Sequence, residues 1–187
     1  MNRTNHRCPG VIVGFLWVLL CGECSAGCGY TLAGRGTFLP ASIKTIGVPS
    51  FTNRTPIFNF ETQLTQKVRA EFIGRGKYTI VPNDTGVDAL IVGEISSARI
   101  DPTSINPQTG FAAGYTVTVT AKVELRTLPG NQVLWQNPAM AFREDYAALS
   151  GTSPTDPNAF FGQNANALDR MSTDFARAIV SAILEAF

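Results

Sequence analysis

Strict alternation of apolar and polar residues between Tyr115 and Arg126 constrains the fold of this chain more than any other feature. Successive side chains of a β-strand point to opposite faces of its sheet, so the pattern predicts one strand with a buried face and a polar face. At about 3.3 Å per residue the strand would be roughly 40 Å long. Such alternation is typical of an antiparallel sheet covered on one side, with the other side facing water or a polar partner.

Shorter patterns predict further strands on both sides of this one. Apolar or alternating runs that end at proline, glycine or polar turns indicate where these strands lie. They cover Ser42–Val48, Tyr78–Val81, Ala89–Ile100 and Gln132–Gln136, and Phe142–Tyr146 extends the last one after an interruption at Pro138. The polar or proline-rich segments 50–56, 101–114 and 147–158 are predicted to be loops.

Two other stretches have the period of a helix. Apolar side chains recur at every fourth position between Phe60 and Phe72. This spacing predicts an amphipathic helix over residues 59–74, with Asn59 as its N-cap. A second apolar stripe, which includes Phe175 and Ile179, predicts a long helix from about residue 160 to residue 186.

The order of these elements predicts the fold class. Strand, helix, several antiparallel strands and a final helix make an α+β chain, in which two helices can cover one sheet face. We expect a two-layer sandwich, with a mostly antiparallel four- to five-stranded sheet and two helices on one face. Residues 42–187 would form this single α+β domain.

The N-terminal segment has the features of a lipoprotein signal peptide. A positive start is followed by an apolar run of about 11 residues, Val11–Cys21, which is too short to span a membrane. Small residues then precede Cys28, although Ser25 stands where an aliphatic residue is usual. We predict that residues 1–27 are the signal peptide, that Cys28 is the lipid attachment site and that residues 28–41 are a lipid-anchored tether. Ordinary secretion, with cleavage near Ala26 or Gly27, is the alternative.

The composition of the remaining chain disfavours an enzyme and a nucleic-acid-binding protein. The whole chain has a net charge of +1, and the predicted signal peptide carries Arg3, Arg7 and Glu23, so the rest is formally neutral. A neutral domain has no electrostatic attraction for nucleic acid. The only histidine, His6, lies in the predicted signal peptide, as do all cysteines except Cys28. Without these residues the domain lacks the usual general base, thiol nucleophile and zinc ligands, so we expect no catalysis, metal or cofactor.

Several motifs, taken in order, resemble the LptE-type lipopolysaccharide-assembly lipoproteins. The resemblance covers nearly all of the chain after the predicted signal peptide. The residues that carry it are Cys28-Gly29-Tyr30 with Leu32, Val48-Pro49-Ser50-Phe51 with Asn53, the Phe60–Phe72 helix, Asp88–Ile95, the Tyr115 strand, Val133-Leu134-Trp135, Phe142–Tyr146 and the alanine-rich terminal helix.

The resemblance implies a function at the outer membrane. Such proteins sit inside a large LptD-type β-barrel as its plug and assembly partner, and they contact lipopolysaccharide. A lipid-anchored position on the periplasmic side of the outer membrane follows from this, and Gly29 after the cysteine favours the outer membrane by analogy. An auxiliary lipoprotein of a trans-envelope transporter is the alternative with the same anchor and fold.

Some relatives use basic residues against the phosphates of lipid A. The segment 101–114 contains no lysine or arginine. Lys122, Arg126 and Arg143 are therefore the candidates for lipopolysaccharide binding, and solvated strand residues are the alternative interpretation of all three.

Overall fold

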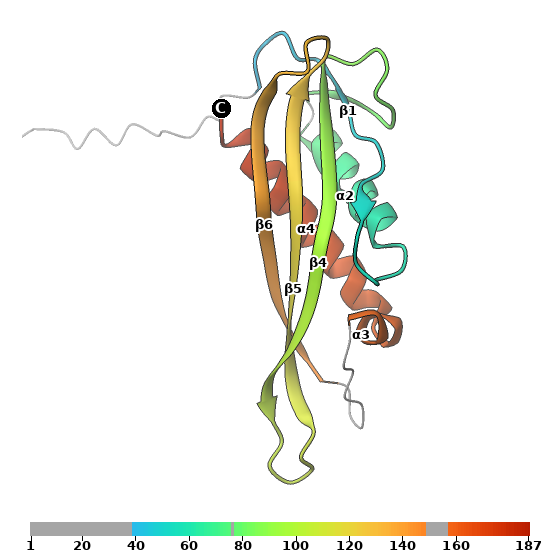
Figure 1. Ribbon diagram of the computed structural model, residues 1–187, viewed down its shortest axis with the longest axis vertical. Coiled ribbons are helices and arrows are strands. Elements are labelled where there is room, and N and C mark those ends of the chain that lie inside the picture. Colours follow the sequence, from blue (N-terminus) through green and yellow to red (C-terminus); the bar gives the residue numbers. More distant parts are fainter. Residues whose placement is uncertain (1–38, 76, 149–156) are drawn as a thin grey trace, which may run out of the picture. The chain divides into compact units, whose positions relative to one another are not determined.

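Three long antiparallel strands lie side by side and form the main part of the sheet (Figure 1). They are β4 (Ala89–Ile105), β5 (Ala112–Thr127) and β6 (Val133–Ala147). The computed structural model describes residues 39–75, 77–148 and 157–187. The predicted signal peptide, Cys28 and most of the predicted tether lie outside the described residues.

The alternating stretch forms most of β5, the middle strand of the three. Its odd-numbered residues from Tyr115 to Leu125 are buried, and its even-numbered residues are half-buried or exposed. The predicted division into a core face and a polar face is therefore confirmed.

Short parallel strands complete a mixed sheet of six strands. They are β1 (Thr45–Gly47), β2 (Thr52–Asn53) and β3 (Thr79–Val81). The order is β3-β1-β4-β5-β6, with β2 also paired to β4. The sequence predicted β1 and β3 but placed β2 in a loop, because a strand of two residues has no recognisable period.

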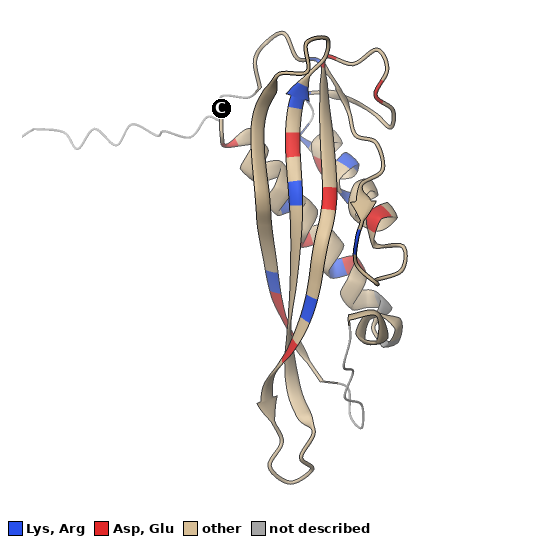
Figure 2. Cartoon of the chain, viewed as in Figure 1, with Lys and Arg blue, Asp and Glu red and all other residues tan. Residues whose placement is uncertain are grey.

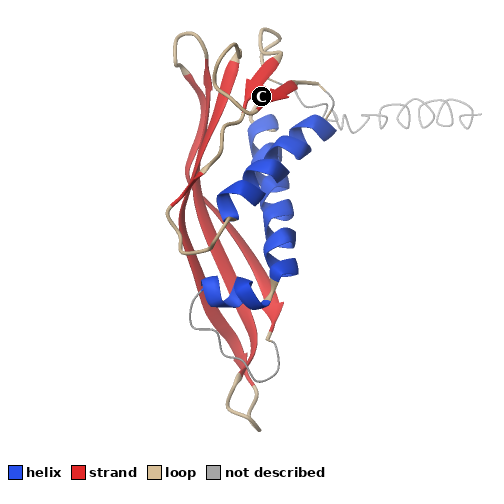
Figure 3. Cartoon of the chain, turned by 90° about the vertical axis from the view of Figure 1, so that its right-hand side faces the viewer, coloured by secondary structure: helices blue, strands red, loops and turns tan. Residues whose placement is uncertain are grey.

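Two helices pack together on one face of this sheet (Figure 3). Helix α2 (Phe60–Gly74) buries the predicted stripe from Phe60 to Phe72, and α4 (Ala165–Leu184) buries Met171, Phe175 and Ile179. The predicted α+β sandwich, with two helices on one face of a mostly antiparallel sheet, is confirmed.

The prediction of one uninterrupted helix from residue 160 to residue 186 is wrong. A short helix, α3 (Pro157–Gln163), ends at Asn164, whose φ of −130° is not helical. The Asn164 side-chain amide donates to the backbone carbonyl of Phe160 at 3.0 Å, and the backbone carbonyl of Asn164 accepts from the N–H of Ala167 at 2.9 Å. Asparagine competes with helical hydrogen bonding in this way, so one helix ends and the next begins at this residue.

The predicted loop 101–114 is also wrong in most of its length. Strand β4 continues to Ile105 and β5 begins at Ala112, so only residues 106–111 form the turn. Beyond residue 95, β4 pairs with β5 alone among the described strands. Proline is tolerated on such an edge because no neighbouring strand requires its missing N–H, which explains Pro102.

Pro138 does not interrupt the last strand either. It lies in β6, which ends the strand order of the sheet. The pairing shifts by one residue between Asn137 and Met140, and the N–H of Ala139 bonds to the Asn137 side chain at 3.1 Å. The proline therefore occupies a bulge on an edge strand, where it removes no necessary ladder hydrogen bond.

Candidate functional site

The sheet face opposite the helices carries the polar half of the three long strands. We call this surface the outer face. Its charged residues are interleaved along the strands, with lysine or arginine next to aspartate or glutamate (Figure 2). They are Glu94, Arg99 and Asp101 on β4, Lys122, Glu124 and Arg126 on β5, and Arg143 and Asp145 on β6.

Two arginines of the outer face flank one threonine. In the sheet register, Arg99 of β4 and Arg143 of β6 both pair with Thr118 of the intervening strand β5. Neighbouring strands lie about 4.8 Å apart, so the two arginine backbones are about 10 Å apart, within reach of one small anion. The Nε of Arg143 lies 3.4 Å from the Thr118 hydroxyl, to which it donates.

These side chains line a hollow of about 250 Å³. The hollow is also lined by Ser97, Asp101 and Thr120. One row further along, Asp101 and Asp145 both pair with Thr116, whose hydroxyl bonds to the Asp145 carboxylate. We call the hollow, defined by the six residues that line it, the arginine cradle.

The arginine cradle has N–H donors and positive charge that its own residues do not fully pair. Among the described residues neither Arg99 nor Arg143 forms an ion pair. Guanidinium groups present planar sets of N–H donors that suit phosphate and carboxylate oxygens, and the Thr118 hydroxyl can also donate. Asp101 is the one carboxylate in the lining, so the cradle retains an excess of positive charge.

The structure does not gather the three predicted lipopolysaccharide-binding residues. Lys122 is four residues from Thr118 along β5 and Arg126 is eight, which is roughly 13 Å and 26 Å along the strand. Lys122 pairs in register with Glu94 and lies two residues from Glu124 on the same face. The Nε of Arg126 is buried without a hydrogen-bond partner in the described structure. Of the three candidates, Arg143 is the one that lines the described hollow, together with a second cation, Arg99.

Sequence reasoning missed Arg99 because of a bulge. Ile95 pairs with Ala121 and Ser97 pairs with Thr120, so Ser96 is an extra residue in β4. Strict alternation from Ile91 would turn Arg99 towards the core, whereas the extra residue turns it to the outer face. The signal was the polar pair Ser96-Ser97, which breaks the alternation just before Arg99.

A second polar cluster lies on the helix side of the sheet and has a structural role. The Glu144 carboxylate of β6 accepts from the Nε of Arg170 of α4 at 2.6 Å and from the Tyr146 hydroxyl at 2.8 Å. The Arg170 guanidinium also lies 4.7 Å from the centroid of the Tyr146 ring. Burial, together with the Glu144 carboxylate, raises the pKa of Tyr146, so the hydroxyl remains a proton donor. The cluster joins the sheet edge to α4 and leaves no free base.

Two negative findings concern the described residues alone. Within residues 39–75, 77–148 and 157–187, no three His, Cys, Asp or Glu side chains are grouped as metal ligands. No helix formed by these residues is both long and apolar enough to cross a membrane.

Comparison with known proteins gives a family and two related folds. The family model described as "LptE: Lipopolysaccharide-assembly" matches residues 43–183. The rare lipoprotein B from Shewanella oneidensis has 19% identity and a TM-score of 0.50, covering 76% of this chain and 96% of its own. A protein of Xanthomonas campestris has 10% identity and a TM-score of 0.51, covering 79% of this chain and 90% of its own. No curated protein sequence matches significantly. At identities this low, the similarity to the two solved structures shows a shared fold alone.

Proposed function

Because this chain belongs to the LptE family of lipopolysaccharide-assembly proteins, we propose that it plugs and helps to assemble an LptD-type β-barrel in the outer membrane. In this role it assists the insertion of lipopolysaccharide into the outer leaflet. The family is one of non-catalytic assembly lipoproteins, so the protein acts by binding and positioning.

The polar outer face is the observation that supports the plug. Three strands of 15 to 17 residues carry threonines and charges of both signs on the outer face. The lumen of a large outer-membrane barrel is polar, so an uncovered face of this kind matches it better than it matches lipid. Interleaved charges give the face no strong field of one sign, and such a surface fits a mixed polar wall.

The arginine cradle supports contact with lipopolysaccharide. Arg99 and Arg143 flank Thr118 on the two neighbouring strands and line the same hollow, and this arrangement suits a phosphate group such as those of lipid A. Lys122 and Arg126, the other two candidates, have acidic or apolar neighbours in the register. We therefore propose the cradle as the contact and assign Lys122 the role of a solvated strand residue.

The anchor completes the proposal. Lipidation of Cys28, after removal of residues 1–27, would hold the domain on the periplasmic side of the outer membrane. Two or more acyl chains bind a membrane stably, whereas one chain does so only marginally. Replacing Cys28 by alanine should release the protein from the membrane fraction, and a variant that stays membrane-bound without its barrel would contradict this assignment.

Purification from the native envelope tests the plug. Tagged protein is extracted in mild detergent, and its partners are identified and counted. A stoichiometric large β-barrel is the expected result. An inner-membrane transporter as partner would favour the auxiliary role in a trans-envelope transporter, and the absence of any partner would contradict both.

Lipopolysaccharide binding by the purified protein tests the arginine cradle. Arg99→Ser with Arg143→Ser removes both cations, and we expect affinity to fall on the order of tenfold for each charged hydrogen bond lost. Lys122→Ser on the same face is the matched control, with a change of less than about twofold. Equal losses in the control and the cradle variants would show a general effect of charge and would reject the cradle.

A further inference from the structure

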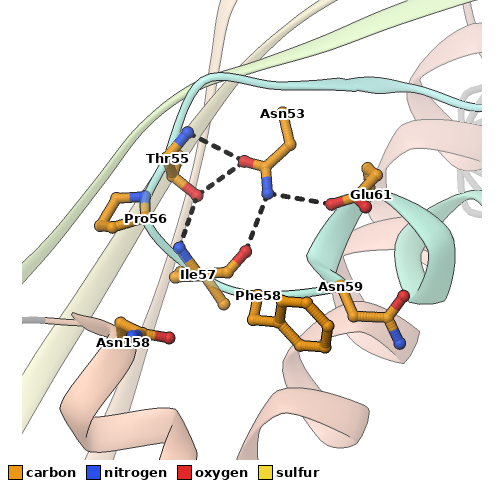
Figure 4. Close-up of a pocket in the computed structure, with 8 residues that line it drawn as sticks. All are labelled: Asn53, Thr55, Pro56, Ile57, Phe58, Asn59, Glu61 and Asn158. Carbon is orange, nitrogen blue, oxygen red and sulfur yellow. Dashed lines mark hydrogen bonds between the residues drawn. The ribbon is translucent and has the colours of Figure 1, made fainter.

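A second hollow lies where the segment after β2 leads into helix α2 (Figure 4). Its volume is about 640 Å³, within the range of small-molecule sites. We call it the Phe58 hollow. It is lined by Asn53, Thr55, Pro56, Ile57, Phe58, Asn59, Glu61 and Asn158.

A hydrogen-bond network fixes the segment that carries the Phe58 ring. The Asn53 side-chain amide donates to the Ile57 carbonyl at 2.8 Å and to the Glu61 carboxylate at 3.0 Å. The Asn53 carbonyl oxygen accepts from the N–H and the hydroxyl of Thr55, at 2.9 and 2.7 Å. Both ends of this one amide are therefore used to hold the backbone on either side of Pro56.

The Phe58 side chain itself contributes nothing to the core. It is 85% exposed, the most exposed of the large hydrophobic side chains in the described chain. The neighbouring Ile57 is 1% exposed and anchors the segment in the hydrophobic core. The hydrogen-bonded segment around Pro56 thus holds the exposed ring of Phe58 at the edge of the hollow.

The polar groups around the ring have free hydrogen-bonding capacity. Asn59 is the N-cap residue immediately before α2, with a φ of 61°, and its side chain makes no capping hydrogen bond. Asn158 approaches from α3, and within the described structure no hydrogen bond involves its side chain. Glu61 uses one of its carboxylate oxygens towards Asn53.

The composition of the lining selects the class of ligand. Among the described residues that line the hollow there is no lysine or arginine, and the one charged group is the Glu61 carboxylate, so an anion would find no cationic side chain there. Amides and a carboxylate offer donors and acceptors to hydroxyl groups. The face of an aromatic ring carries partial negative charge and attracts the weakly positive C–H groups of a flat apolar surface. A sugar ring has both kinds of surface.

We propose that the Phe58 hollow binds a neutral saccharide, with the sugar stacked on Phe58 and hydrogen-bonded to Asn59, Asn158 and Glu61. This adds a ligand to the protein beyond its proposed plug role. The hollow and the arginine cradle share no residues, so a saccharide and a phosphate would be bound at separate places.

Titration of the full-length protein in detergent with defined glycans tests the proposal. One probe is dephosphorylated, lipid-free oligosaccharide released from lipopolysaccharide of the native envelope, and the other is chitotetraose, which represents peptidoglycan sugars. Binding is followed by calorimetry and by saturation transfer from protein to sugar protons. Binding of the first probe alone identifies lipopolysaccharide as the source of the sugar, and binding of chitotetraose identifies a wider saccharide site.

Variants show whether the sugar occupies this hollow. Phe58→Ala should weaken binding at least tenfold and Asn158→Ala severalfold, with unchanged thermal unfolding because both side chains are exposed. Ile73→Ala is the matched control, since Ile73 is a 59% exposed hydrophobic residue at the far end of α2, and its affinity should equal that of the wild type.

Two results would overturn the proposal. One is the absence of saturation transfer with both glycans at millimolar concentration. The other is equal affinity in Phe58→Ala and the wild type. If Phe58→Ala instead loses the barrel in envelope purification while no glycan binds, the ring is a protein contact and the saccharide site is rejected. The plug role is judged by the purification alone, so either proposal can fail without the other.

Discussion

At the scale of single residues, Asp88 holds together three segments that are distant in the sequence. One of its carboxylate oxygens accepts from the backbone N–H groups of Lys44 and Thr45, at 2.9 and 2.8 Å. Its backbone donates to the Thr45 carbonyl and accepts from Leu128. The hydrogen bonds from Thr45 and Lys44 lower the pKa of Asp88, because they stabilise the charged form.

Acid should therefore weaken the fold partly through Asp88. Its folded-state pKa lies below the unfolded value of about 3.9, so its charge adds stability above pH 4 that is lost as pH falls through the lowered pKa. Asp88→Asn keeps an acceptor oxygen but removes the charge. We expect the difference in unfolding free energy between wild type and variant to be constant near neutral pH and to shrink below about pH 4. Denaturant unfolding at a series of pH values measures it, and a difference that grows in acid would contradict the assignment.

Gly93 is needed for its lack of a side chain. A Cβ added there would lie 2.5 Å from two carbons of the Phe51 ring, which packs directly on the strand. We expect Gly93→Ala to destabilise the protein by about 1–3 kcal/mol through overpacking. Thermal or denaturant unfolding tests this. Gly74→Ala at the end of α2 is the control, because its Cβ meets nothing within 4 Å, and it should be neutral or stabilising by up to about 1 kcal/mol.

At the scale of elements, bulges decide which side chains reach the outer face. Strand β4 carries an extra residue at Ser96, and β6 carries one between Asn137 and Met140. Each changes the facing of all residues beyond it, because the side-chain period of a strand is two. Arg99 and Arg143 come together across Thr118 as a result, although strict alternation would separate them.

Deletions should distinguish a bulge residue from a ladder residue. Removing Ser96 leaves every flanking pair and its facing intact, so the variant should fold, with a loss of about 0.5–1.5 kcal/mol for the Ser96 hydroxyl bond to the Thr120 carbonyl. The pairing of β5 is regular at Thr118. Removing this residue would shift the register by one and move the buried side chains of half the strand to the outer face. Circular dichroism and unfolding curves compare the two, and equal damage from both deletions would show that Ser96 is a ladder residue.

At the scale of the whole domain, the helices cover only part of the sheet. The β4–β5 hairpin extends beyond the helix layer (Figures 1 and 3). Residues 101–105 are exposed, whereas Val117, Val119, Ala121, Val123 and Leu125 on β5 are fully buried. Local stability follows buried apolar contacts, so the two ends of the sheet should differ.

Hydrogen exchange should reveal this difference. We expect amides of residues 101–114 to exchange through local opening, at rates well above those of residues 119–125, which should open only with global unfolding. Mass spectrometry of the exchanged protein measures both segments in one sample. Uniform protection along β5 would mean that the exposed hairpin is held by contacts other than the helix layer.

The sequence by itself determined the facing of β5, the buried stripe of α2 and the α+β class, because these depend on periods within one segment. Tyr115–Arg126 alternates and Phe60–Phe72 repeats every fourth residue, and burial of one face follows directly. Only the tertiary structure decided the parallel pairing of β1 with β3, the extension of β4 through Pro102, and the meeting of Arg99 with Arg143. Those features depend on which distant segment lies alongside a strand and on single extra residues in its ladder. The spacing of apolar residues within one segment does not encode either of them.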